Sequence, residues 1–139
     1  LVTAYRTQKM LKVALCIATG ALARTELGQY DEAEKTLKEI VARGAGLEPD
    51  LARLALAEVY RRRGELDKAV DGYRGLASNP AANVPRDFAL LSAAEALESG
   101  ERWAEARATY QELVEEFPGS VYATRARTRA EFLQTAVQS

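Results

Sequence analysis

The feature that most constrains the fold of this sequence is an internal repeat. Three glycines are spaced 36 residues apart, and three alanines recur at spacings of 36 and 37. A fixed period in this range is typical of helical hairpins that stack into an array. The recurring residues are Gly28, Gly64 and Gly100, together with Ala33, Ala69 and Ala106.

Each unit has the pattern helix, turn, helix and breaker. Apolar residues recur at intervals of three and four within the helices, as one buried face requires. Gly64 and Gly100 are predicted to end the first helix of their units in a left-handed cap, and residues 26–29 to form the turn of the first unit. We expect a single domain over residues 1–139, with repeats at about 12–46, 48–79 and 86–119 and a capping helix at about 120–137, beginning near Ser120.

The composition favours an all-α fold. Val and Ile account for only 11 of 139 residues, and a chain so poor in β-branched residues is unsuited to a sheet. The absence of His excludes His-based catalysis and His-ligated metals, and a single Cys excludes an internal disulfide or a thiolate cluster. We therefore expect no enzyme activity, no cofactor and no metal. The net charge of −1 argues against a nucleic-acid partner.

The longest uncharged stretch, Val13–Ala23, is 11 residues long. A membrane span needs about 20 residues, so we expect a buried helix here and no membrane insertion within this chain. Because this helix is apolar nearly all round, something must cover it. Residues 1–10, an upstream repeat, a second copy of the chain and a client are the alternatives. A homo-oligomer contact would use Val13, Ile17, Ala18 and Leu22.

The second unit carries the most recognisable motif, and the other two units repeat it. About residues 12–119 resemble the tetratricopeptide repeat (TPR) family, although the period is longer than the usual 34 residues of that family. The motif of the second unit consists of Ala57, Tyr60, Gly64, Glu65, Leu66, Asp67, Lys68, Ala69, Tyr73 and Leu76.

The resemblance implies a right-handed superhelical array of about three TPR-like helix-turn-helix repeats plus a C-terminal capping helix. It also implies a concave groove, lined by the first helices of the units, that binds a peptide or helix of another protein. The clamp with which some members grip chaperone tails is missing, because its Asn positions hold Thr19, Ala55 and Ser92. Transferred position by position, the groove residues of the second and third units are Leu51, Leu54, Glu58, Arg61, Arg62, Phe88, Leu91, Glu95 and Glu98. The same transfer gives Leu15, Ala18 and Leu22 in the first unit.

A narrower resemblance concerns the third unit. The stretch from Tyr110 to Ser120 is similar to bacterial envelope repeat proteins, including periplasmic scaffolds tethered by one upstream span. The preceding residues 85–91 resemble the ancillary translocon-subunit type. This resemblance favours the bacterial periplasm, with an upstream anchor, over the cytoplasm.

These observations together predict a non-catalytic scaffold for protein–protein interaction. In this hypothesis the apolar groove residues bury a client segment, and the charged ones set its register. The alternative is a structural self-assembly module whose first apolar helix mediates oligomerisation. Trp103 is expected to pack between the second and third units.

Overall fold

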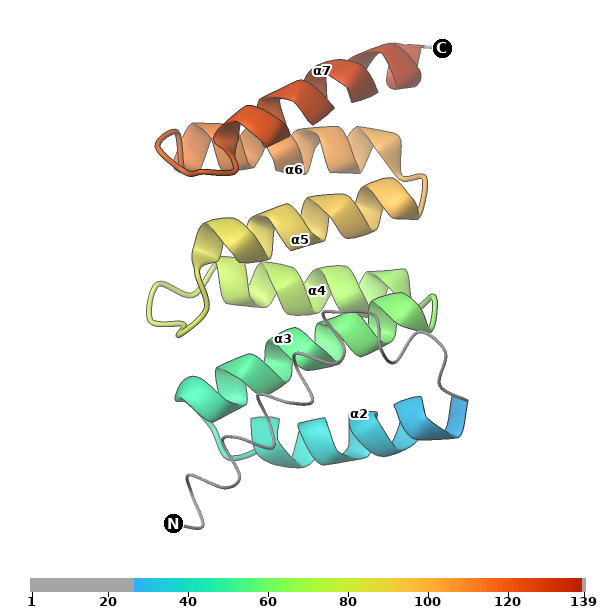
Figure 1. Cartoon of the computed structure of the whole chain (residues 1–139), viewed down its shortest axis with the longest axis vertical. Coiled ribbons are helices and arrows are strands. Elements are labelled where there is room, and N and C mark those ends of the chain that lie inside the picture. Colours follow the sequence, from blue (N-terminus) through green and yellow to red (C-terminus); the bar gives the residue numbers. More distant parts are fainter. Residues whose placement is uncertain (1–26, 139) are drawn as a thin grey trace.

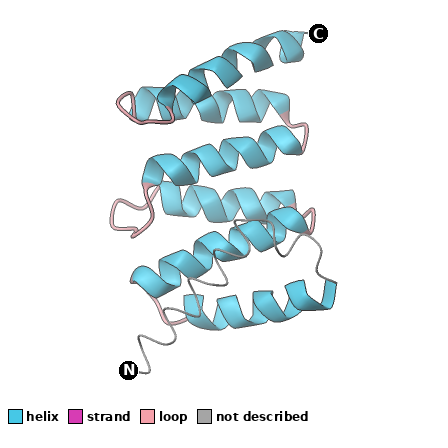
Figure 2. Ribbon diagram, viewed as in Figure 1, coloured by secondary structure: helices cyan, strands magenta, loops and turns pink. Residues whose placement is uncertain are grey.

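The computed structural model describes residues 27–138, and over this range the chain consists of helices joined by short connections (Figures 1 and 2). Each helix packs on the next along the chain, so the array grows in one direction. No strand occurs within these residues, and the predicted all-α repeat fold is confirmed. The helices are α2 (Leu27–Val41), α3 (Leu47–Arg62), α4 (Leu66–Ala77), α5 (Arg86–Ser99), α6 (Trp103–Glu116) and α7 (Ala123–Gln138).

The repeat assigns the helices two alternating roles. Helices α3 and α5 are the first helices of their units, and α2, α4 and α6 are second helices. Helix α7 takes the position of a further first helix, because Ala94 and Leu97 of α5 recur 36 residues later as Ala130 and Leu133. Both residues of α7 are buried, at 6% and 0% exposure, as are their counterparts in α5.

Small residues mark the places where paired helices meet. Ala57 of α3 and Ala69 of α4 are 1% and 0% exposed, and Ala94 of α5 and Ala106 of α6 are both fully buried. A Cβ atom placed on Gly72 would lie 3.0 Å from the Cβ of Ala57, so α4 approaches α3 as closely as a glycine permits. A larger side chain at such a contact would overpack it at a cost of about 1–3 kcal/mol.

The turn between the two helices is the same in both complete units. The Glu65 N–H donates to the Tyr60 carbonyl at 2.8 Å, and the Arg102 N–H donates to the Leu97 carbonyl at 2.9 Å. The two bonds are related by a shift of 37 residues. A hydrogen bond from an N–H to the carbonyl five residues earlier is typical of a helix end at which the residue just before the donor has a left-handed backbone conformation.

The left-handed residue of these turns is Gly64 in one unit and Glu101 in the other, with φ values of 82° and 61°. The prediction that Gly100 supplies the cap in the third unit is therefore wrong. Gly100 has a φ of −87° and lies one residue too early, because this unit is one residue longer before its second helix. The equal glycine spacing in the sequence does not reflect equivalent positions.

An aspartate near the start of each first helix ties that helix to the loop before the next one. Asp50 accepts hydrogen bonds from the backbone and side-chain N–H groups of Asn83, at 2.8 and 3.0 Å. Asp87 accepts a 2.7 Å hydrogen bond from the hydroxyl of Ser120. Both pairs are 33 residues apart, so the same tie is repeated along the array.

Two helix boundaries differ from the predictions. Helix α2 begins at Leu27, so residues 27–29 are helical where a turn was expected. Helix α7 begins at Ala123 rather than near Ser120. The Ser120 hydroxyl, expected to cap that helix, instead donates to Asp87 and accepts from the N–H of Tyr122 in the loop.

The two left-handed positions give a matched pair of predictions. We expect Gly64→Ala to lower the free energy of unfolding by about 1 kcal/mol, because a Cβ atom disfavours this conformation. Glu101→Gly should raise it by about 0.5–1 kcal/mol, because the same strain is removed. Urea denaturation followed by circular dichroism measures both, and changes of the same sign would contradict the assignment of the turn.

The Asp50 tie predicts a pH-dependent stability. Burial opposes ionisation of Asp50, which is 3% exposed, but the hydrogen bonds from Asn83 and Arg53 outweigh it and lower its pKa below the ordinary 3.8. A lowered pKa stabilises the fold at pH values above 3.8 and loses that contribution as the pH falls through the folded-state value.

We therefore expect Asp50→Asn to lower the free energy of unfolding at pH 7 by about 1.5–3 kcal/mol. The difference from the unsubstituted chain should shrink as the pH falls below the ordinary pKa. Urea denaturation at several pH values measures this, and a difference that stays constant down to pH 2 would contradict it.

Candidate protein-interaction face

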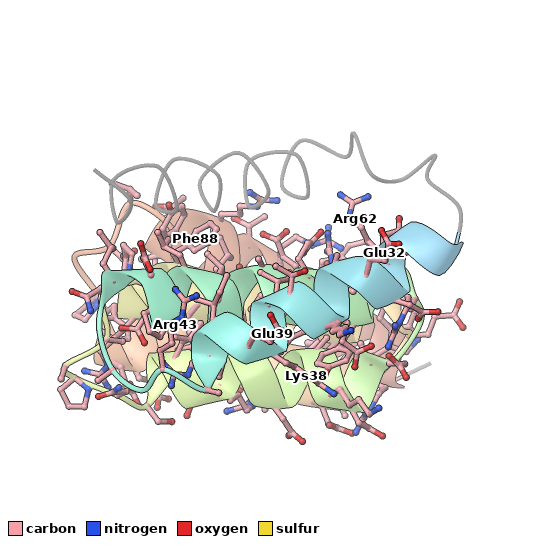
Figure 3. All side chains as sticks on the ribbon, turned by 90° about the horizontal axis from the view of Figure 1, so that it is seen from below. Glu32, Lys38, Glu39, Arg43, Arg62 and Phe88 are labelled. Carbon is pink, nitrogen blue, oxygen red and sulfur yellow. The ribbon has the colours of Figure 1, made fainter. Side chains whose placement is uncertain are left out.

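We define the A-helix face as the nine predicted groove residues of the first helices α3 and α5. Arg62 and Phe88 project from the same side of the ribbon, whereas Lys38 of α2 projects from the opposite side (Figure 3). Leu51, Leu54 and Phe88 are half-buried and rest against the main core. They therefore leave apolar surface that a partner can contact.

Leu91 contributes little surface to this face. Its side chain is 3% exposed and belongs to the main core. A residue this deeply buried has little area left to contribute to a partner. Leu91 therefore supports the face from beneath.

The charged residues of α3 on this face are paired with one another. Glu58 accepts a hydrogen bond from Arg61 at 2.9 Å and forms an ion pair with Arg62 at 3.2 Å. The buried hydroxyl of Tyr73 donates to the second Glu58 oxygen at 2.6 Å. Burial lowers the pKa of the Arg61 guanidinium, but the hydrogen bond to Glu58 and the charge of Glu58 raise it by more, so the pKa of Arg61 lies above its ordinary value. The carboxylate is thus fixed in place from the core side.

The carboxylates of α5 on this face bind residues of α7. Glu95 forms an ion pair with Arg125 at 3.3 Å. Glu98 is bonded to Arg129 and accepts a 3.2 Å hydrogen bond from the buried Tyr110 hydroxyl. Helix α7 therefore extends the A-helix face through Arg125 and Arg129, which both pair with carboxylates of α5.

Two aromatic residues of the extended face were not predicted from the sequence. The ring of Tyr122 lies 6.2 Å from that of Phe88. Phe132 of α7 is 59% exposed, and the Arg129 guanidinium lies 4.6 Å from its ring centre. The recurrence of Ala94 as Ala130 could have revealed α7 as a further first helix, and with it these residues.

Two clefts lie away from the nine predicted residues. One, of about 470 Å³, is formed by α3 and α4, where Gly72 and Gly75 lack side chains. The other, of about 320 Å³, lies between α6 and α7 and is lined by Val114 and Arg127 among others. Within residues 27–138, no group of His, Cys, Asp and Glu side chains has the arrangement needed to hold a metal ion.

Three further predictions concern residues elsewhere. The suggested oligomer contact, Val13, Ile17, Ala18 and Leu22, lies outside the described residues. Trp103 is 36% exposed at the start of α6, and its packing between units stays a prediction. Among the described helices, none is long and apolar enough to cross a membrane.

Stacked helical hairpins with one continuous face of first helices define a helical-repeat protein. Family models of the tetratricopeptide repeat match residues 19–84 and 88–120. The chain therefore belongs to the TPR family, as its sequence motifs predicted, and such repeats are generally protein–protein interaction modules. Neither the curated proteins nor the solved structures gave a significant match.

The buried phenols beneath the face give a prediction of their own. Burial and the adjacent carboxylates Glu58 and Glu98 raise the pKa values of Tyr73 and Tyr110. A raised pKa stabilises the fold below the ordinary value of 10.0, and this contribution is lost as the pH rises above it.

We expect Tyr73→Phe to lower the free energy of unfolding at pH 7 by about 1.5–3 kcal/mol, because Glu58 loses a buried donor. Its stability should also fall less steeply above pH 10 than that of the unsubstituted chain. Urea denaturation at several pH values measures both. A pH profile identical to that of the unsubstituted chain would contradict the role of the Tyr73 hydroxyl.

Proposed function

We propose that this protein is a non-catalytic scaffold that binds a peptide or helix of another protein on its A-helix face. The observation that carries the proposal is the half-buried Phe88, set beside Tyr122 on the face that α3, α5 and α7 share. Aromatic side chains held in place by packing are the usual anchors of protein interfaces.

The apolar and the charged residues of this face would have different roles in binding. Leu51 and Leu54 supply apolar surface on α3, and Phe88 supplies apolar surface on α5. The charged residues Glu58 and Glu95 are already held by arginines, so they present fixed charges rather than mobile side chains. Apolar contacts would supply most of the affinity, and the charges would select the register of the partner.

Tethering in the bacterial envelope and self-assembly through the first apolar helix are the finer predictions from the sequence. Both depend on residues outside the described range or upstream of residue 1. The described face supports binding of a partner without requiring either.

A library of displayed random peptides, selected on the immobilised full chain, tests the proposed function. We expect Phe88→Ala to weaken binding of the selected peptides by about tenfold or more, as loss of an interface anchor does. The double variant Arg61→Glu, Arg62→Glu should weaken the peptides that carry acidic residues. Fluorescence anisotropy with labelled peptides measures both affinities.

Trp103→Ala is the matched control, because Trp103 is an aromatic residue on a second helix and lies outside the A-helix face. It should leave the affinity unchanged. Circular dichroism checks that each variant keeps its helical content. Selected peptides whose affinity falls with Trp103→Ala and not with Phe88→Ala would overturn the proposed binding face.

A further inference from the structure

The cleft formed by α3 and α4 lies apart from the A-helix face. Its floor includes Leu56, Ala57 and Leu76, of which the last two are 1% and 2% exposed. Its volume of about 470 Å³ falls within the range of roughly 300–1,000 Å³ that is typical of ligand pockets. None of the nine residues of the A-helix face lines it. The cleft is therefore a second concave surface with an apolar floor.

The second and third units differ at the positions that open this cleft. Gly72 and Gly75 of α4 correspond to Thr109 and Glu112 of α6, because α4 and α6 are offset by 37 residues. In the third unit both side chains bind Arg74 of α4. The Thr109 hydroxyl accepts from its guanidinium at 2.6 Å, and the Glu112 carboxylate accepts at 3.1 Å. An arginine thus occupies this place between the second helices of the second and third units.

The preceding second helix does not supply the equivalent cation. Arg74 corresponds to Lys38 of α2 at an offset of 36 residues, and Lys38 forms an ion pair with Glu34 of its own helix at 3.0 Å. In α4 the position of Glu34 is held by Val70, which cannot pair with Arg74. The lysine is therefore held on α2, and the two glycines of α4 offer it no side chain to bind.

Gly75 has no packing role that explains it. A Cβ atom placed there would contact no other described helix within 4 Å, and its φ is not in the left-handed region. Gly72 differs, since a Cβ atom there would lie 3.0 Å from the Cβ of Ala57. Glycine in the interior of a helix is destabilising relative to alanine. What Gly75 provides in return is access to the floor of the cleft.

The charges that line the cleft leave one carboxylate without an internal partner. Asp50 and Arg53 are bonded to each other at 2.7 Å, and Arg53 also donates to the Gly44 carbonyl at 2.9 Å. Asp71 is exposed on α4 and forms no ion pair with any other residue of the described range. These three are the charged residues among those that line the cleft, so its charge is negative. A cationic group is the complementary ligand.

We propose that this cleft binds a basic segment of a partner protein through an arginine. The alkyl stem of that arginine lies over Gly72 and Gly75, and its guanidinium pairs with Asp71. The bound residue takes the place that Arg74 takes in the following unit. Arginine fits better than lysine, because its planar guanidinium is more weakly hydrated and its stem packs on apolar surface such as Leu56.

This site is independent of the A-helix face. Lys38, whose counterpart in the next unit marks the equivalent place, projects from the side opposite Phe88 (Figure 3). The chain therefore has separate surfaces for two partner segments, and the inference stands or falls without the proposed function.

A titration of the full chain followed by nuclear magnetic resonance tests the cleft with a defined probe. The probe is the blocked peptide acetyl-Leu-Arg-Ala-amide. Its matched control carries citrulline in place of arginine, which has nearly the same shape and no charge. We expect the arginine peptide to shift the amide resonances of residues 53–57 and 71–76, and to bind about fivefold more tightly or more than the citrulline peptide.

Three results of this titration would overturn the proposal. The first is an absence of shifts at these residues up to about 10 mM arginine peptide. The second is equal affinity for the two peptides, which would exclude recognition of the charge. The third is a set of shifts confined to α5 and α7, which would assign the peptide to the A-helix face.

Gly75→Gln fills the cleft and should keep the fold, because glutamine favours a helix more than glycine does. We expect it to raise the melting temperature and to weaken binding of the arginine peptide by about tenfold or more. Gly75→Ala is the matched control, since it adds only a Cβ atom that meets no neighbouring helix. It should raise the melting temperature without that loss. Unchanged binding by Gly75→Gln would overturn the location of the site.

Asp71→Asn tests the pairing with the guanidinium. We expect it to weaken the arginine peptide by about fivefold and to leave the citrulline peptide unchanged. Glu116→Gln is the matched control, because it removes the same charge from an exposed position of α6 outside the cleft. It should change neither affinity. A loss in both variants, or in neither, would overturn the role of Asp71.

Discussion

The close approach of paired helices at alanine positions is the constraint on which the rest of the structure depends. Ala57 of α3 lies so close to α4 that a Cβ atom placed on Gly72 would be only 3.0 Å from the Cβ of Ala57. Ala69, Ala94 and Ala106 are equally buried. Because the second helices fill the core from one side, the first helices can leave Leu51, Phe88 and their charged neighbours on the other. The proposed interaction face is thus a consequence of packing between the paired helices beneath it.

Ion pairs and hydrogen bonds join different units of the array. Asp31 of α2 pairs with Arg63 at 2.9 Å, and Asp67 of α4 pairs with Arg102, just before α6. Both aspartates are exposed to solvent, so each pair contributes little to stability. The buried Asp50 is different, since three donors converge on it from Asn83 and Arg53. Stability in a repeat array is a sum of units and neighbouring interfaces, and here the loop ties define those interfaces.

The sequence predicted which segments are helical better than it predicted the residues at which the helices begin and end. Alanine spacing and apolar periodicity predicted the α3–α4 and α5–α6 hairpins correctly, because both reflect packing that the units repeat. Glycine spacing misplaced the third turn, since Glu101 and not Gly100 adopts the left-handed conformation there. Ser120 was expected to cap a helix, but its hydroxyl is bonded to Asp87, 33 residues away. Long-range bonds of this kind decide boundaries that local propensity cannot.

The difference between packing that each unit repeats and long-range contacts also explains which residues of the candidate site were predicted from the sequence. Leu51 and Phe88 follow from position within a repeat, whereas Arg125 and Phe132 belong to a helix that local patterning presents only as a cap. Arg125 pairs with Glu95 of α5, and Phe132 lies against Arg129, which pairs with Glu98 of α5, so both become part of the face only when α7 is treated as another first helix. Every carboxylate of the nine-residue set is bound to an arginine in the free protein. A charged partner on the proposed face would therefore have to exchange one ion pair for another, an exchange that gives little net affinity and strong discrimination between partners.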